Sequence, residues 1–222
     1  MPMKSRDALR RELKTILTQK ERSLMRSLRT PERIQDFLSA LPANHEIGGD
    51  SCHSPRIVMR ERNAHCFEGA LFAATTLWYH GHKPLLLDLQ TAPHDFDHVV
   101  ALFQRDGLWG AISKTNHAVL RWRDPIYRTV RELALSYFHE YFLDSGEKTL
   151  RAYSRPFSLE RFGVQWVASD EPLWYIGDAL DASPHEPIAP ARALRRARRA
   201  EAFERAVMSR EEYARTHTKD NE

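Results

Sequence analysis

Cysteine is scarce in this sequence. The 222 residues include only two cysteines, Cys52 and Cys66, which are too few to build a disulfide-stabilised scaffold. So few thiols are compatible with a reducing compartment. One bridge between the two is possible in principle, but the sequence favours a free Cys66 that is available for chemistry.

Long apolar runs are also lacking. No stretch approaches the roughly 18 consecutive apolar residues of a membrane-spanning helix. The N-terminus leads directly into charged residues, without the apolar core of a signal peptide. We therefore expect a cytoplasmic protein that has no membrane partner.

The sequence has no strong excess of charge of one sign. Its net charge of +3 is small for this length and does not by itself predict nucleic-acid binding. Arginines cluster within Arg192–Arg199, but glutamates follow closely within Glu201–Glu212. This mixture favours a solvated helix face and makes a nucleic-acid partner unlikely, although the cluster leaves that possibility open.

A hydrophobic fraction of 42% is enough for a substantial core and predicts one domain with appendages. Residues 6–28 carry leucines at helical spacing. A second helix is predicted to begin with Thr30 as N-cap and Pro31 in the first helical position. The expected organisation is an N-terminal helical pair over 1–45, a core domain over 46–182, and a Pro-rich linker with a charged helical tail over 183–222.

The centre of the sequence changes from a helical to an extended pattern. The apolar run from Cys66 predicts a helix that ends at Gly81, a natural left-handed cap. Residues 85–89, 96–104 and 108–115 predict strands, with Asp106-Gly107 as a hairpin turn between the last two. Helix is predicted to resume after Asp124-Pro125 and again after Pro172, so the fold class is α+β.

Cys66 stands where a thiol is easily ionised. Free backbone N–H groups and the helix dipole favour negative charge at a helix N-terminus, which lowers the pKa of a thiol there. A histidine beside it would complete a nucleophile–base pair, and His98 on the second predicted strand is the candidate. The other interpretation is that Cys66 is only a small buried hydrophobe.

The predicted hairpin suggests what lies near His98. If Asp106-Gly107 is a two-residue loop, Arg105 pairs with Leu108 and the ladder carries His98 opposite Thr115. Direct and diagonal partners share a face, so His98, Thr115 and Ser113 lie together and Asn116 points to the other face. A three-residue loop or a bulge would change this register.

These residues resemble a known family. Arg62-Asn63-Ala64-His65-Cys66 opening an apolar helix, the Gly81-His82-Lys83-Pro84 link, and Asp97-His98-Val99-Val100 before a hairpin are similar to the transglutaminase-like (papain-like) superfamily, over about residues 55–116. The resemblance implies a cysteine-bearing helix packed on an antiparallel sheet. It also implies that Cys66 is the nucleophile, that His98 is its base, and that an aspartate on the next strand orients the histidine.

One position departs from that family pattern. Trp109 fits the tryptophan that usually precedes the aspartate, but Ser113 stands where the aspartate is expected. A hydroxyl can accept from the imidazole N–H and fix its tautomer, yet it cannot offset the imidazolium charge as a carboxylate does. A Cys–His ion pair depends less on this third group, because the thiolate itself balances the imidazolium.

Three further residues surround the predicted nucleophile. The oxyanion would be stabilised by the Cys66 backbone N–H and by an upstream side-chain donor, for which Asn63 is the nearest amide. His65 and Glu68 flank the thiol. Because adjacent helix positions point apart, we expect His65 to be a capping or surface residue rather than the base.

The function predicted from these features is acyl transfer or hydrolysis at an amide or ester. The substrate would be a peptide, a protein or a small amide or ester, and no cofactor is expected. Metal binding is disfavoured because the ligand pairs Cys52-His53 and His65-Cys66 are adjacent, whereas zinc sites usually space their ligands. The alternative is an inactive domain that binds a partner, which Ser113 and the helical ends favour.

Overall fold

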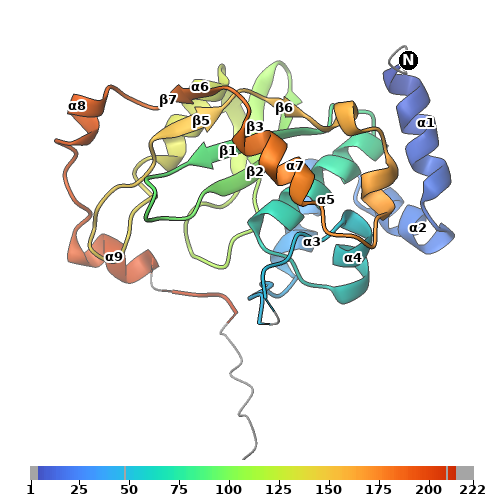
Figure 1. Ribbon diagram of the computed structural model, residues 1–222, viewed down its shortest axis with the longest axis horizontal. Helices are drawn as coiled ribbons and strands as arrows, with labels where there is room; N and C mark the ends of the chain where they lie inside the picture. Colours follow the sequence, from blue (N-terminus) through green and yellow to red (C-terminus); the bar gives the residue numbers. More distant parts are fainter. Residues whose placement is uncertain (1–4, 48, 209, 214–222) are drawn as a thin grey trace, which may run out of the picture.

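In the computed structural model, helices pack on an antiparallel sheet (Figure 1). The structure describes residues 5–47, 49–208 and 210–213, and within these it contains nine α-helices and seven strands. Gly48, Ser209 and residues 214–222 of the predicted tail lie outside the described residues. The predicted α+β class is confirmed. None of the helices in the described ranges has the length and apolar character needed to cross a bilayer.

Three helices precede the core: α1 (Arg6–Ile16), α2 (Gln19–Ser27) and α3 (Pro31–Ser39). The predicted single helix over 6–28 is therefore wrong. Thr18 interrupts it, because its hydroxyl accepts the Glu21 N–H while the Glu21 carboxylate accepts the Thr18 N–H. The predicted start of α3, with Thr30 as N-cap and Pro31 first, is confirmed.

The helix that begins at Cys66 is the central one. α5 (Cys66–Tyr79) is buried from Glu68 to Tyr79 and packs across β2. A helix that is apolar all round is typical of such a buried position. Its predicted end is confirmed by Gly81, which has a φ of 102°. The short helix α4 (Pro55–Glu61), capped by the Ser54 hydroxyl, precedes it and was not predicted.

The sheet has the order β4-β3-β2-β1-β5-β7, with β6 also paired to β1. Its strands are β1 (Leu85–Gln90), β2 (His98–Arg105), β3 (Leu108–Ile112), β4 (Arg123–Tyr127), β5 (Ala152–Ser154), β6 (Phe157–Ser158) and β7 (His185–Pro187).

The β2–β3 hairpin has the predicted register. Arg105 pairs with Leu108, and positive φ angles at Asp106 (53°) and Gly107 (78°) fit a two-residue turn with left-handed residues. The regular ladder ends at Ala101 opposite Ile112. The part of the predicted third strand beyond Ile112 therefore does not form, and Ser113 and Thr115 belong to the loop after it.

Both faces of the sheet are covered, which explains the nearly continuous apolar sequence of its central strands. On one face Leu86, Val99, Ala101 and Phe103 pack with residues of α1 to α5. On the other face the alternate residues pack against α6 (Val130–Tyr137); these are Leu87, Leu89, Val100 and Leu102. Strands buried on two sides lack the polar alternation of a sheet with one wet face.

The segment after Asp124-Pro125 differs from its prediction. It forms β4 instead of helix, and α6 begins only at Val130. Pro125 is tolerated because β4 is an edge strand, where a missing N–H leaves no sheet partner unpaired. Thr129 then caps α6 by accepting the Glu132 N–H, which fixes the later start of the helix.

The C-terminal third folds back on the sheet. Two 3₁₀-helices, η1 (Leu159–Phe162) and η2 (Gln165–Ala168), lead to α7 (Trp174–Asp181), the helix predicted after Pro172. The stretch expected to be a linker contains β7, whose His185 Nε2 lies 3.0 Å from the buried Asp88 carboxylate. The region expected to be one projecting helix instead contains α8 (Ala191–Leu194) and α9 (Ala202–Met208), at the opposite end of the sheet from α1 (Figure 1).

Candidate active site

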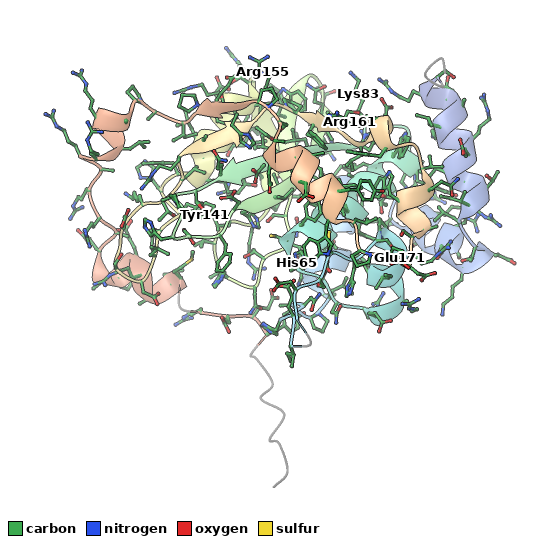
Figure 2. All side chains as sticks on the ribbon, in the orientation of Figure 1. His65, Lys83, Tyr141, Arg155, Arg161 and Glu171 are labelled. Carbon is green, nitrogen blue, oxygen red and sulfur yellow. The ribbon has the colours of Figure 1, made fainter. Side chains whose placement is uncertain are left out.

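The thiol of Cys66 opens into a cleft. Cys66 is the first residue of α5, it is partly exposed, and it lines a cleft of about 450 Å³ together with His98. His65 and Tyr141, labelled in Figure 2, also line it. The structure therefore brings together the two residues that the sequence proposed as nucleophile and base.

Two imidazoles lower the pKa of the Cys66 thiol. Burial by itself would raise the pKa of this thiol, but hydrogen bonds from His65 and His98, and the charges on those rings, hold it well below its ordinary value. A lowered pKa means that the thiolate, the nucleophilic form, is present at neutral pH. The sequence pointed to one histidine beside Cys66, and the structure contains two.

His98 is held by Ser113. The Nε2 atom of His98 lies 2.8 Å from Ser113 Oγ, and Ser113 Oγ donates its proton to the Leu120 carbonyl at 2.6 Å. Since a hydroxyl has one proton, Ser113 must accept from His98, so Nε2 carries hydrogen and Nδ1 is left for the thiol. The predicted proximity of His98 and Ser113 is found, and the tautomer follows from it.

Ser113 is itself fixed from α3. The Gln35 side chain donates to the Ser113 carbonyl at 2.8 Å and accepts the Ser113 N–H at 2.9 Å. These two bonds satisfy the main chain of a residue that lies just outside the β2–β3 ladder. Gln35 thus replaces the sheet partner that Ser113 has lost, and it fixes the position from which the hydroxyl accepts from His98.

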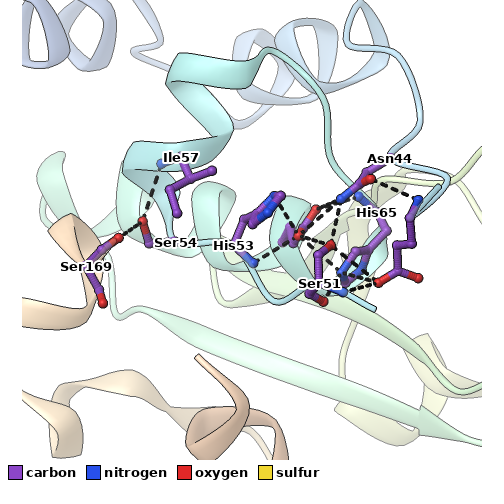
Figure 3. A network of polar contacts seen from close by, with 9 residues as sticks. Asn44, Ser51, His53, Ser54, Ile57, His65 and Ser169 are labelled. Carbon is purple, nitrogen blue, oxygen red and sulfur yellow. Dashed lines mark hydrogen bonds and ion pairs between the residues drawn. The ribbon is translucent and has the colours of Figure 1, made fainter. Parts of the chain in front are cut away.

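His65 is backed by a buried carboxylate. Glu68, one turn into α5, has no exposed side-chain surface and accepts bonds from Ser51 Oγ (2.9 Å), the His53 N–H (2.9 Å), Asn44 Nδ2 (3.1 Å) and the His65 N–H (3.1 Å). Figure 3 shows Asn44, Ser51, His53 and His65 converging on this network. Burial opposes ionisation of Glu68, but the His65 ring and these donors lower its pKa to about 2.

The charge state of His65 follows from its neighbours. Its Nε2 lies 3.1 Å from the Ser51 carbonyl and 3.4 Å from Glu68 Oε1. Burial disfavours the imidazolium, yet hydrogen bonds to Cys66 and Glu68 raise the pKa of His65 to about 11. His65 is therefore a cation between two anions, the Cys66 thiolate and the Glu68 carboxylate.

The sequence did not predict the role of His65, because its side chain was expected to point away from that of Cys66. His65 is the N-cap of α5, with extended backbone angles (φ −90°, ψ −175°), so the rule that adjacent helical residues point apart does not apply to it. Glu68 could have indicated this role, since a glutamate in the third helical position commonly accepts the N–H of the N-cap residue.

The remaining predicted residues have different positions. Asn63 is absent from the cleft lining in the described part of the chain, and its Oδ1 is buried without a partner there. Thr115 lines the cleft. Asn116 lines it as well, although it was expected on the other face, because the alternation of a strand stops with the ladder at Ile112. Lys114 is a cleft cation that the sequence reasoning missed.

Lys114 is an unusual lysine. Its side chain is 2% exposed, its Nζ donates to the Leu41 carbonyl at 2.5 Å, and burial lowers its pKa to about 8. It packs against the first turn of α5 so closely that a Cβ on Gly69 would meet the Lys114 Cβ at 2.4 Å. Gly69 therefore has no side chain because the strand-end loop bearing Lys114 needs that space.

Cys52 provides a contrast within the same chain. Cys52 is 1% exposed, and burial raises the pKa of its thiol to about 12. Both cysteines are free. In the described ranges no group of three or more His, Cys, Asp and Glu side chains is arranged to hold a metal ion. A larger hollow of about 960 Å³ lies between α1 and residues 155–165, and its described lining contains neither cysteine nor histidine.

The predicted basic cluster does not form one continuous helix. Within Arg192–Arg199 only the residues up to Leu194 belong to α8, and Arg198 pairs with Glu201. Nucleic-acid binding by this cluster stays a prediction. A scan against protein-family models finds no match to this chain, and neither does a search of curated proteins.

Proposed function

We propose that this protein is a thiol enzyme of transglutaminase-like type that catalyses acyl transfer or hydrolysis at an amide or ester. The observation that carries the proposal is the Cys66 thiol, which stands at the start of α5, is open to a cleft, and is hydrogen-bonded to two imidazoles that lower its pKa. A buried structural cysteine needs none of these features, and Cys52 has the opposite ones.

The proposed reaction has two steps. The Cys66 thiolate attacks the substrate carbonyl carbon, and a C–S bond forms while the carbonyl oxygen takes the negative charge. His98, protonated at both nitrogens, gives its Nδ1 proton to the leaving amine or alcohol as the carbonyl collapses to a thioester. An acceptor, water or an amine, then gives a proton to His98 and attacks the thioester, which releases the product and restores the thiolate.

The oxyanion is assigned to the start of α5. The first N–H groups of a helix have no acceptor within that helix, and the Cys66 N–H is one of them. Lys114, on the wall of the same cleft, supplies a positive charge, and its Nζ donates to the Leu41 carbonyl and lies 5.2 Å from the Tyr213 ring. We assign the role of side-chain donor to the oxyanion to Lys114 rather than to Asn63, because of these two residues Lys114 is the one that lines the cleft.

Ser113 acts in this proposal as a positioning residue. It accepts from His98 Nε2 in both the neutral and the charged form of the ring, so it holds the ring through the whole cycle without fixing its charge. The missing carboxylate is offset elsewhere, since Glu68 supports His65 and the resulting cation stabilises the thiolate. Phe96 lies at the rim of the cleft with 90% of its surface exposed and offers an apolar contact to a substrate.

The test compares the two thiols of the native chain. We expect iodoacetamide near neutral pH to alkylate Cys66 at least about a hundredfold faster than Cys52, because only Cys66 has a thiolate at that pH. Peptide mass spectrometry after timed labelling measures both rates in one sample. Equal and slow labelling of the two cysteines would contradict the proposal and favour an inactive domain that binds a partner.

A substrate assay completes the test. p-Nitrophenyl acetate reports acylation and turnover of a thiol enzyme without knowledge of the natural substrate. We expect a burst of nitrophenolate equal to the protein concentration, followed by slower turnover, and no burst from Cys66→Ala. A Cys52→Ser chain is the matched control and should retain the burst.

A further inference from the structure

The chain's own C-terminal segment borders the cleft. After α9 the chain runs back across the molecule (Figure 1), and residues 210–213 lie against the loop that follows β3. His117 forms an isolated antiparallel bridge with Glu211, and the Glu212 N–H donates to the Asn116 carbonyl at 2.8 Å. Met208 and Glu211 line the cleft together with Cys66 and His98.

The Asn116 side chain binds the main chain of this segment. Its Oδ1 accepts the Tyr213 N–H at 2.9 Å, and its Nδ2 donates to the Tyr213 carbonyl, also at 2.9 Å. A carboxamide that meets both polar groups of one residue binds a peptide main chain regardless of side chain. Gln35 grips Ser113 in the same way. Asn116 and His117 therefore form a ledge beside the cleft that holds the main chain of residues 211–213, which bridges to His117 at Glu211 and bends at Glu212 and Tyr213.

Most contacts that hold the segment are polar and close to solvent, and the Tyr213 ring also lies 5.2 Å from the Nζ of the buried Lys114. Arg121 pairs with Glu212 at 2.7 Å, with both side chains about one-third exposed, and the Tyr213 hydroxyl donates to the Ser39 carbonyl at 2.9 Å. The helix that precedes the segment, α9, has no buried residue, and Phe203 on it is 84% exposed. A segment with so little apolar burial opens at low free-energy cost compared with the core.

We propose that residues 210–213 are a releasable strap: they occupy the Asn116–His117 ledge in cis and narrow access to Cys66, and a peptide that offers the same main-chain N–H and carbonyl groups can take their place. This inference rests on the proposed function in that access matters only if Cys66 is the nucleophile. The ledge itself exists independently of any chemistry at the thiol.

The first test asks whether the ledge binds peptide in trans. Glu212→Pro removes the N–H that bonds to the Asn116 carbonyl, whereas Glu212→Ala at the same position keeps it and loses only an exposed ion pair. Both changes are made in the full chain with Cys66→Ala, so no thiol chemistry is involved. The probe is a fluorescein-labelled synthetic peptide with the sequence of residues 208–217, and its binding is followed by fluorescence anisotropy.

We expect the Glu212→Pro chain to bind the peptide at least about tenfold more tightly than the Glu212→Ala chain, because a strap held in cis competes at a high effective concentration. Adding Asn116→Ala to the Glu212→Pro chain should abolish the gain. Equal affinity of the proline and alanine chains, or a gain that survives Asn116→Ala, would overturn the inference.

The second test measures access to Cys66 separately from its reactivity. Iodoacetamide and the larger 5-iodoacetamidofluorescein share one reactive group. The rate constant of the larger reagent at Cys66, divided by that of iodoacetamide, therefore reports access alone. In a chain that retains Cys66, Glu212→Pro should raise this ratio about fivefold over Glu212→Ala, the change expected for losing one hydrogen bond that keeps the strap closed.

The outcomes separate the two proposals. An unchanged ratio overturns the strap as a gate, however reactive Cys66 is. Slow alkylation by both reagents in every chain contradicts the proposed function, while the peptide titration still decides whether the ledge binds a peptide main chain.

Discussion

The two imidazoles beside Cys66 are supported in different ways. On one side His65 faces Glu68, a fully buried carboxylate that also accepts bonds from Asn44, Ser51 and His53. On the other side the His98 Nε2 atom is bonded to Ser113, whose hydroxyl in turn donates to the Leu120 carbonyl. One histidine is held by charge and the other by a neutral acceptor.

The difference matches the two tasks of the proposed mechanism. An imidazole that stays charged benefits from a permanent counter-ion, and burial makes that counter-ion strong because little solvent screens it. An imidazole that gains and loses a proton in each cycle works best when its pKa lies near the operating pH, and a strong counter-ion would hold the proton on it. The carboxylate is thus placed where the charge is meant to persist.

Removing His98 should have the largest effect. His98→Ala takes away the group that activates the acceptor, and general acid–base catalysis contributes about 10²–10⁴ in rate. We expect steady-state hydrolysis of p-nitrophenyl acetate to fall by that factor while the initial burst persists, because His65 still holds the thiolate. His139→Ala, outside the cleft lining, is the control and should leave both phases unchanged. Loss of the burst together with turnover would show that His65 alone does not maintain the thiolate, and so that the two histidines do not have separate roles.

Removing the Glu68 charge should come next. Glu68→Gln leaves the partly buried His65 without its counter-ion, and breaking a buried pair costs up to about 3–5 kcal/mol in the free energy of unfolding. Because the pKa of Glu68 is lowered to about 2 in the folded state, this stabilisation is complete above its ordinary pKa of 4.5 and is lost as the pH falls towards 2. Urea unfolding at neutral pH and at pH ~3 measures the destabilisation and its loss in acid.

The pH trend is what distinguishes charge from packing. The difference between the native chain and Glu68→Gln should shrink on acidification, whereas a purely steric defect would be independent of pH. Glu61→Gln, an exposed glutamate of α4, is the matched control and should change the stability little at either pH. A constant difference at both pH values would rule out the Glu68–His65 charge pair as its source.

Removing His65 should raise the pKa of the Cys66 thiol rather than slow the turnover step. His65→Ala takes away a hydrogen bond and a positive charge that lower the pKa of Cys66, so the pKa rises. The rate of iodoacetamide alkylation near pH ~6.5 should drop by about 10- to 100-fold and recover as the pH rises, since one pKa unit changes the thiolate fraction tenfold. His53→Ala also loses a contact to Glu68 and serves as the control. An unshifted pH profile for His65→Ala would mean that His98 alone sets the thiol pKa.

Removing the Ser113 hydroxyl should have the smallest effect. Ser113→Ala deletes two hydrogen bonds, the one accepted from His98 and the one donated to the Leu120 carbonyl. Only the first acts on the catalytic ring, and its loss, worth about 1 kcal/mol, corresponds to roughly fivefold in kcat for p-nitrophenyl acetate. Ser113→Thr keeps the hydroxyl and should restore the rate, a rescue that a packing role would not give. A loss as large as that of His98→Ala would contradict the view that this side of the site needs only a neutral acceptor.

Much of the site's local geometry could be predicted from short stretches of sequence. Asp106-Gly107 fixes the two-residue turn, because both residues tolerate positive φ, and that turn sets the register from Arg105 back to Ala101. The start of α5 at Cys66 and its end near Gly81 follow from the length of the apolar run and from the glycine. These features depend on neighbours in sequence, so periodicity and turn chemistry are sufficient.

The errors came where another interaction, distant or local, overrides helical spacing. Ile126 matched the helical stripe after Asp124-Pro125, yet the edge of β3 offered hydrogen bonds there and the segment became β4, with Ile126 left 66% exposed. The leucines of 6–28 matched one helix, but the Thr18–Glu21 capping pair divided it. Helical spacing alone does not report such breaks.

By itself, the sequence determined a cysteine at the start of a buried helix and a histidine at the start of a strand whose hairpin brings Ser113 close. Only the tertiary structure decided the electrostatics of the thiol. It folds Ser51 and His53 onto Glu68, brings His65 as well as His98 to Cys66, and returns residues 210–213 to the edge of the cleft. The physical reason is that a pKa depends on burial and on all charges within a few ångströms, whichever part of the chain they come from.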